Sequence, residues 1–190
     1  IGKVQYSCIT NENGGILDDL LVYKLSEEKY MLVVNASNTE KIIAWMRKHN
    51  NFNLKITNIT KNRGLLALQG PKALSLLQKI TEYNLKKISY YSFDFIDLLE
   101  EKGILVSATG YTGAGGFEIY ADKGSINKIW EALFKVKDSG LLPIGLGARD
   151  TLRMEMGYCL YGNEINELTT PLEAGLSWIV DLNKDFIGSR

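Results

Sequence analysis

Histidine, cysteine and proline are scarce in this sequence of 190 residues, which has one, two and three of them. The single histidine, His49, excludes a His-based catalytic triad or zinc site, and we expect it to be exposed at the polar end of a helix. Cys8 and Cys159 form no CxxC motif and lack metal-ligand spacing. They indicate free thiols in a reducing compartment.

The sequence also lacks net charge and long apolar runs. Lys+Arg and Asp+Glu number 22 each, so no overall field favours nucleic acid or an anionic membrane as a partner. No apolar run approaches the length of a transmembrane helix. The content of 45% hydrophobic and 23% charged residues is typical of a soluble globular protein. Because the chain starts at Ile1 without Met or a targeting segment, we interpret it as a piece of a longer protein.

Short alternating segments mixed with amphipathic ones predict an α+β fold with antiparallel or mixed sheets and flanking helices. Residues 3–10, 16–23 and 30–34 are expected to form an antiparallel meander. Ser37 and Glu40 fit a capping box at the start of a helix over 38–48. Further strands are predicted at 54–60, 64–69 (apolar throughout, hence fully buried), 90–98, 104–109, 117–120 and 176–182, and further helices from Pro71, over 125–136 and over 146–156.

Two adjacent carboxylates, Asp18 and Asp19, interrupt the predicted strand 16–23. Successive residues of a strand face opposite sides, so one of the two side chains should point inward. A buried carboxylate is costly unless it is paired, and this indicates a site or a buried ion pair. The alternative is that the two residues mark an edge strand or its bulge.

The glycine-rich segment 110–118, GYTGAGGFE, is not a phosphate-binding loop. It contains no GKS or GKT and no GxGxxG that opens a helix. It leads into a strand, so its glycines are expected to shape a turn that brings the backbone close to something. Tyr111 and Glu118, on either side of that turn, are candidates for binding a planar ligand with polar edges. The alternative is a plain hairpin with a surface Glu118.

Arg149 lies early in the predicted helix 146–156, where the helix dipole disfavours a cation. This position indicates bidentate capture of a carboxylate, and a solvated or salt-bridged arginine is the alternative. Arg153 is expected to pair with Asp150, three residues earlier. These residues by themselves name no reaction.

Six stretches, in order along the chain, resemble the T protein family of the glycine cleavage system, which are tetrahydrofolate-dependent aminomethyltransferases. They are NENGGILDDLLVYKL, LVVNAS, LLALQGPKA, TGYTGAGGFEIY, GLGARDTLRMEMGYCLYGNEI and TTPLEAGLSW. The resemblance implies that residues 1–190 are the folate-binding portion of a three-domain protein, without the family's N-terminal segment and C-terminal β-barrel domain.

The activity implied is transfer of an aminomethyl group carried on the lipoyl arm of the H protein. Tetrahydrofolate accepts the methylene carbon and ammonia leaves. The implied partners are lipoylated H protein and folate, with no metal, nucleic acid or membrane. Relatives are cytoplasmic in bacteria and mitochondrial in eukaryotes, and the Lys- and Asn-rich composition favours the cytoplasm.

The resemblance also implies roles for individual residues. Asp19 matches the family's essential aspartate, which orients the folate and stabilises positive charge during transfer. Glu118 matches the glutamate that accepts hydrogen bonds from the pterin, and Arg149 matches an arginine at the folate site. Ser37 and Ala114-Gly115 depart from the residues common in relatives. The other positions implied around the folate are Tyr6, Tyr23, Asn35, Tyr111 and Trp178.

Two other functions remain open on the same resemblance. A folate-dependent demethylase, or the folate domain of a dimethylglycine or sarcosine oxidising enzyme, would share the fold and much of the folate site. A non-enzymatic relative that assists iron–sulfur cluster assembly would carry a K-G-C-x-x-G-Q-E motif. This sequence has no such motif, because Cys159 lies in YCLY, and the presence of Asp19 also disfavours that function.

Overall fold

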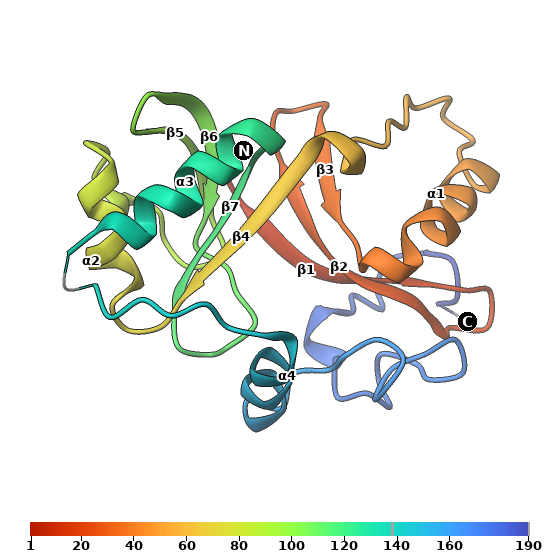
Figure 1. Ribbon diagram of the computed structural model, residues 1–190. Coiled ribbons are helices and arrows are strands. Elements are labelled where there is room, and N and C mark those ends of the chain that lie inside the picture. The colour runs from red at the N-terminus through yellow and green to blue at the C-terminus, as the bar shows by residue number, and fades with distance from the viewer. Residues whose placement is uncertain (138, 190) are drawn as a thin grey trace. The chain divides into compact units, whose positions relative to one another are not determined.

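The structure, a computed structural model, describes residues 1–137 and 139–189 and divides the chain into two units. Unit 1 contains Ile1, Lys3–Asn58 and the residues from Cys159 onward, whereas unit 2 contains Gly2 and Ile59–Tyr158. Each unit is built on its own antiparallel sheet with flanking helices, which confirms the predicted α+β class (Figure 1).

Unit 1 is built on a three-stranded meander of β1 (Val4–Thr10), β2 (Ile16–Lys24) and β3 (Tyr30–Val33), in the order β1-β2-β3. Both pairings are antiparallel, as predicted. Strand β2, which carries Asp18 and Asp19, is the central strand of the sheet, but β3 pairs only with its residues 21–24, so among the described strands the two aspartates face β1 alone. Thr10 faces Ile16 and Ile9 faces Asp18, which leaves Leu17 as an extra residue directly before the pair. The alternative of an edge strand or its bulge therefore describes the local pairing, although Asp18 is buried.

The helix of unit 1 begins differently from the prediction. A 3-10 turn, η1 (Ala36–Asn38), runs into α1 (Thr39–Lys48), and no side chain caps α1. The capping box of Ser37 and Glu40 is therefore wrong, because Ser37 lies inside the 3-10 turn. His49 is half-buried rather than exposed, since its ring packs 4.2 Å from that of Trp45.

Two predicted strands do not form. Residues 54–59 have no regular structure, and within the predicted strand 176–182 the only element is a 3-10 turn, η5 (Ser177–Ile179). Alternation of side chains favours a strand only where a neighbouring strand supplies hydrogen bonds. The segment after Cys159 instead packs as turns and loops, with Ile165 and Leu176 buried against Ile16 of β2.

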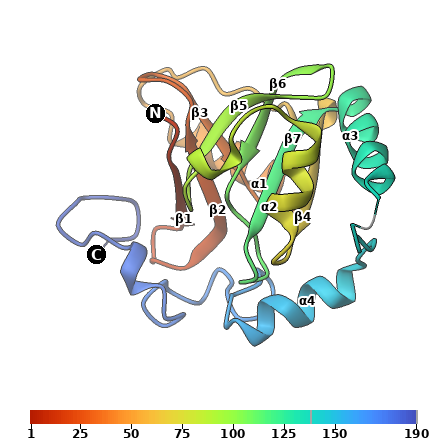
Figure 2. The ribbon, with the colours of Figure 1, turned by 90° about the vertical axis from the view of Figure 1, so that its left-hand side faces the viewer.

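Unit 2 is built on a four-stranded antiparallel sheet in the order β4-β7-β6-β5. Its apolar face is covered by α2 and by α3, whose Ile129 is fully buried (Figure 1, Figure 2). The elements are β4 (Arg63–Gln69), α2 (Ala73–Leu77), β5 (Phe93–Leu98), β6 (Glu101–Ser107), β7 (Gly116–Asp122) and α3 (Lys123–Lys135), with short 3-10 turns η2 (Thr60–Asn62), η3 (Gln78–Ile80) and η4 (Leu85–Lys87).

Two details of unit 2 differ from the sequence-based expectations. Strand β4 is not fully buried: it lies at the edge of the sheet, and Leu65 is 46% exposed. Helix α2 begins at Ala73, two residues after Pro71. The last helix, α4 (Leu146–Glu155), forms as predicted and is followed by Gly157 at φ +71°. None of the helices in the described residues is long and apolar enough to cross a membrane.

Candidate functional site

Asp18 and Asp19 point to opposite faces of β2, as strand geometry requires. Asp18 is 0% exposed, which confirms that one of the pair points inward, and Asp19 is half-buried. Asp19 pairs in register with Cys8 of β1. Tyr6, two residues before Cys8, lies on the same face and diagonally across from Asp19.

Both carboxylate oxygens of Asp19 accept a hydrogen bond. Tyr6 Oη donates to Oδ2 at 3.0 Å, and Asn35 Nδ2 donates to Oδ1 at 2.8 Å. Burial raises the pKa of Asp19, the hydrogen bonds from Tyr6 and Asn35 act against that rise, and the charge of Asp18 adds to it. The result is a carboxylate held in one orientation with a raised proton affinity, suited to handling a proton or facing a developing positive charge.

The candidate aromatic residues on the Asp19 side of β2 are Tyr6, Tyr23 and Trp178, and they differ in exposure. The Tyr6 ring stacks on Trp178, with centroids 5.9 Å apart, and Trp178 is 69% exposed. Burial and the nearby Asp19 raise the pKa of Tyr6 well above its ordinary value, so Tyr6 stays protonated and donates. Tyr23 is 0% exposed and lies on the same face of β2 as Asp19, further along the strand.

In unit 2, Glu118 lies on β7 and faces away from the helix-covered side of the sheet, whose side chains from β7 include Ile119. Its Oε2 accepts from the Thr109 hydroxyl at 2.5 Å and from Tyr120 Oη at 3.4 Å. Within the described part of the chain its other oxygen, Oε1, has no hydrogen-bond partner. Glu118 is therefore no ordinary surface glutamate, and one of its oxygens remains open to a donor.

Burial raises the pKa of Glu118, while the hydrogen bonds from Thr109 and Tyr120 and the charge of Arg149 act to lower it. Arg149, at the start of α4, places its guanidinium carbon 4.6 Å from the centre of the Tyr111 ring. The Tyr111 ring also stacks on that of Tyr158, with centroids 5.9 Å apart and an interplanar angle of 23°. Arg149 thus contacts Tyr111, and its charge reaches Glu118.

The glycine-rich turn before β7 owes its shape to close approaches. Gly116 has φ +141°, and a Cβ there would lie 2.3 Å from the Leu68 carbonyl oxygen. A Cβ on Gly110 would lie 2.0 Å from Oε1 of Gln69. The Gln69 amide donates to the carbonyl of Thr109 at 3.2 Å and so holds the start of the turn. The expected close approach of backbone is therefore confirmed.

Beside this turn lies a cleft of about 300 Å³. It is floored by the glycine-rich turn, and Thr109, whose hydroxyl binds Glu118, reaches its wall. Tyr111, Glu118 and Arg149 do not line this cleft, and Thr109 connects it to Glu118 through its hydroxyl. Its lining residues are Gln69, Tyr90, Ala108, Thr109, Gly110, Gly113, Gly115, Gly116 and Tyr158.

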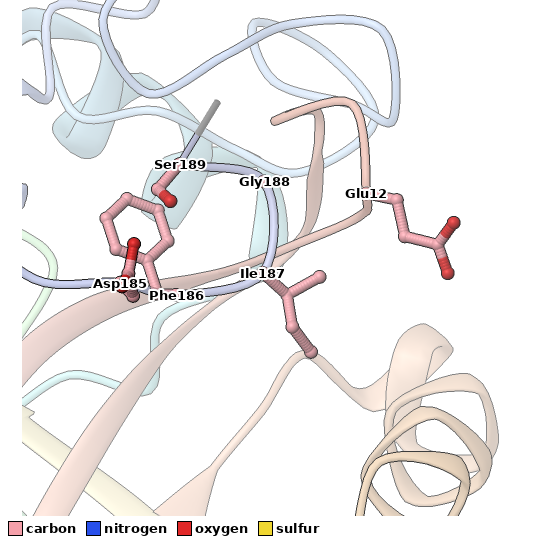
Figure 3. A pocket seen from close by; sticks show the side chains of 6 residues that line it. All are labelled: Glu12, Asp185, Phe186, Ile187, Gly188 and Ser189. Carbon is pink, nitrogen blue, oxygen red and sulfur yellow. The ribbon is translucent and has the colours of Figure 1, made fainter.

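A second, more open hollow in unit 1 is lined by Glu12 and residues 185–189. Figure 3 shows that the side chains of Glu12 and Asp185 extend away from each other there. No polar groups converge on a common point, and the hollow contains none of the candidate residues. We assign it no role.

The candidate residues therefore form two groups, one in each unit. Tyr6, Asp19, Asn35 and Trp178 gather in unit 1, whereas Tyr111, Glu118 and Arg149 gather in unit 2; Tyr23 stands apart as a buried residue. Among the described residues, no group of three or more His, Cys, Asp or Glu could hold a metal ion.

Sequence reasoning gave no role at the site to Thr109 or Tyr158. Both lie in stretches that carry the family resemblance, but only the folded chain places Thr109 beside Glu118 and Tyr158 beside Tyr111. The specific role of Asp18 was open as well. Its signal was the pair of adjacent carboxylates, of which strand alternation turns one inward.

The family model described as the GCVT N-terminal domain matches residues 1–184. The chain belongs to this family. An aminomethyltransferase of Flavobacterium psychrophilum is 51% identical over 189 residues, covering 99% of this chain and 52% of its own length. An aminomethyltransferase of Bacteroides fragilis is 54% identical over 179 residues, covering 94% of this chain and 50% of its own length.

A solved structure supports the same fold assignment. The glycine cleavage system aminomethyltransferase T from Bartonella henselae superimposes with a TM-score of 0.82 at 37% identity, covering 96% of this chain and 48% of that chain. The resemblance of this sequence to the T protein family is thereby confirmed. The chain spans about half the length of the relatives it matches.

Proposed function

We propose that this chain provides the tetrahydrofolate-binding and transfer portion of an aminomethyltransferase of glycine cleavage. The observation that carries the proposal is the Asp19 carboxylate, half-buried on the central strand β2 and held on both oxygens by Tyr6 and Asn35. Membership of the GCVT family, with relatives named aminomethyltransferase, supports it. Location in the cytoplasm stays a prediction.

In the proposed reaction, the carbon–sulfur bond to the aminomethylated dihydrolipoyl arm of the H protein is lost together with the carbon–nitrogen bond to the departing ammonia. Two bonds from that carbon to folate nitrogens replace them, and the two protons that these nitrogens release leave on the dihydrolipoyl thiol and on ammonia. Positive charge develops on the carbon between these steps. Asp19 would stabilise that charge electrostatically and orient the folate nitrogens, which an oriented and partly desolvated carboxylate does well.

Glu118 would bind the donor edge of the pterin. Its Oε2 is held by Thr109, and its Oε1 has no partner among the described residues, which leaves that oxygen for a ligand N–H. Tyr111 and Arg149 would supply a flat and positively charged neighbour for the conjugated part of the folate or for its carboxylates. Trp178 and Tyr6 would serve as an aromatic wall near Asp19, with Asn35 holding that carboxylate. A role for the buried Tyr23 at the folate stays a prediction.

The test is titration of 5-formyltetrahydrofolate into the full-length protein. The wild type should bind saturably, and Glu118→Ala should lose at least ~10-fold in affinity, because a hydrogen-bonded charge is removed from a partly closed site. Glu131→Ala, on the exposed side of α3 and paired with Lys135 at 3.6 Å, is the matched control and should bind as the wild type does. Binding indifferent to Glu118 would contradict the assignment of the pterin site.

Transfer is measured separately, with aminomethylated H protein as donor. Asp19→Ala should abolish formation of 5,10-methylenetetrahydrofolate while the variant still binds 5-formyltetrahydrofolate. If Asp19→Ala transfers the carbon at the wild-type rate, Asp19 is not the catalytic carboxylate. If one-carbon transfer proceeds from a methylated amine without any lipoyl protein, the demethylase alternative is the correct one.

A further inference from the structure

The side-chain amide of Asn35 lies among three acceptors that belong to two adjacent residues. Its Nδ2 is 2.8 Å from Asp18 Oδ1, 2.8 Å from Asp19 Oδ1 and 3.2 Å from the Asp19 carbonyl oxygen. An amide nitrogen has two protons to give. The two short contacts therefore take one proton each, and the same nitrogen connects the inward carboxylate to the outward one.

We propose that Asp18 is a positioning residue: it fixes the amide of Asn35 in the orientation that donates a hydrogen bond to Asp19. The proposal rests on the proposed function, because it gives Asp19 the catalytic role. Asp18 itself is 0% exposed and points away from the face that carries Asp19 and Tyr6. It therefore acts through Asn35 and not on the substrate.

Asp18 leaves Asn35 no alternative orientation. Its Oδ2 accepts the backbone N–H of Asn35 at 2.9 Å, and its Oδ1 accepts Asn35 Nδ2 and Asn38 Nδ2, the latter at 2.6 Å. A turned Asn35 amide would aim its oxygen at two carboxylates at once. Because all three neighbours of Nδ2 are acceptors, only the nitrogen fits there. The backbone contact to the same carboxylate also fixes where the Asn35 side chain starts.

Other ionisable groups also lie near Asp19, and the charge of Asp18 adds to the rise in the pKa of one of them, Cys8. From β1, Tyr6 donates to Asp19 Oδ2, and Cys8 lies opposite Asp19 in register. Burial and the Asp19 charge raise the pKa of Cys8 to about 12, so Cys8 stays a neutral thiol. Cys159 acts on Tyr6 and Cys8, which it faces from the later segment. Asn35 is thus the donor to Asp19 that a change at Asp18 would remove.

Asp18→Asn is the decisive substitution because its two effects on Asp19 have opposite signs. Removing the Asp18 charge lowers the pKa of Asp19, since that charge raises it. The new amide oxygen must accept the fixed backbone N–H of Asn35, which places the new amide nitrogen against the Asn35 side chain. Asn35 then turns its own oxygen toward that nitrogen and also toward Asp19. That reversal raises the pKa of Asp19, because a donor is replaced by an acceptor.

The experiment measures the acidic limb of the pH profile of kcat for methylene transfer, together with titration of the ¹³C-labelled Asp19 carboxyl, in the full-length protein. In Asp18→Asn both should move to higher pH, and kcat should fall by up to ~100-fold because the carboxylate is misplaced. Asn35→Ala should move them in the same direction. In the double variant the upward shift should be no larger than that of Asn35→Ala alone, because the two residues act through one contact and loss of the Asp18 charge by itself lowers the pKa of Asp19.

Asn38→Ala is the control for a purely structural role. It removes the other side-chain donor to Asp18, so it should lower the melting temperature, yet it leaves the contact of Asn35 with Asp19 in place. The acidic limb should stay where it is in the wild type. If Asp18→Asn does not fold, side-chain amide exchange in the wild type decides: both Asn35 Nδ2 protons should be protected, and a freely exchanging one overturns the proposal.

A downward shift in Asp18→Asn, or none, would show that Asp18 acts only as a charge or a packing group. This outcome is separate from failure of the proposed function. The carboxyl titration reports on Asp19 whether or not the protein transfers a methylene group. The catalytic role of Asp19 is tested by Asp19→Ala alone.

Discussion

The buried carboxylate of Asp18 accepts two hydrogen bonds from Asn35, one from its backbone N–H at 2.9 Å and one from its side chain at 2.8 Å. The partners of Asp19 are more adaptable, because the Tyr6 hydroxyl can accept as well as donate. Two adjacent Asp→Asn substitutions should therefore have unequal costs, although they make the same chemical change.

Asp18→Asn is expected to lower the free energy of unfolding by about 1–3 kcal/mol, since fixed donors lose a charged acceptor. Asp19→Asn should change it by less than about 0.5 kcal/mol, because the new amide can donate to Tyr6 and accept from Asn35. Urea unfolding of both variants beside the wild type measures the difference. Equal losses would show that the orientation of the two carboxylates does not matter to stability.

The raised pKa of Glu118 predicts how stability depends on pH. The folded protein holds this proton at pH values where the unfolded chain has released it. The free energy of unfolding should therefore fall as pH rises from the ordinary glutamate value through the raised one. Glu118→Gln should make that fall smaller, the remainder being due to the raised pKa of Asp19, and it should be more stable than the wild type at neutral pH.

Thermal unfolding between about pH 4 and pH 8 measures this dependence. Thr109→Val sharpens the test, because it deletes the 2.5 Å hydrogen bond that favours the ionised carboxylate. The fall in stability should be larger in that variant than in the wild type. A Glu118→Gln protein with an unchanged pH dependence would mean that other groups cause it.

Arg149 is predicted to set the pH at which folate binding is lost. Its charge lowers the pKa of Glu118, so Arg149→Ala should raise that pKa and move the acidic loss of 5-formyltetrahydrofolate binding to higher pH. Arg149→Lys keeps the charge and should leave the midpoint near the wild-type value, although it loses the planar contact with Tyr111. Identical midpoints in all three proteins would exclude an electrostatic role.

Gly15 is expected to tolerate no side chain. A Cβ there would lie 1.8 Å from the carbonyl oxygen of Glu167, and Asn11 Nδ2 donates to the same oxygen at 2.9 Å. Gly15→Ala should cost about 3 kcal/mol of stability because backbone has to move. Gly147→Ala is the matched control: its Cβ would meet nothing within 4 Å in α4, and it should stabilise by about 0.5–1 kcal/mol.

The sequence predicted the elements whose pattern and partners are both local. The meander around Asp19 follows from alternation and from turns at Gly14 and Lys29, and β7 follows from the pattern after Gly116. Residues 54–60 alternate equally well, yet none of the strands in the described part of the chain pairs with them. Alternation is a pattern within one chain segment, whereas a strand forms only when a second segment supplies hydrogen bonds.

The same difference between local patterns and contacts with distant segments applies to the candidate site. Asp19, Glu118 and Arg149 were identified because motifs carry them, and the inward turn of one aspartate followed from strand geometry alone. The hydrogen bond from Thr109 to Glu118 and the triple contact of Asn35 depend on register and on loop paths between elements. No spacing in the sequence encodes those, because the partners come from separate strands and turns.

The discontinuity of unit 1 has a consequence for biosynthesis. Unit 2 is almost contiguous in sequence, whereas unit 1 needs residues from Cys159 onward, including Ile165 and Leu176, which bury Ile16 of β2. A ribosome releases the whole of unit 2 before it delivers the segment that completes unit 1. The apolar side chain of Ile16 on β2, the strand that carries Asp19, therefore stays exposed while all of unit 2 is translated. Nascent chains stalled before Cys159 would be the form of this protein most in need of a chaperone.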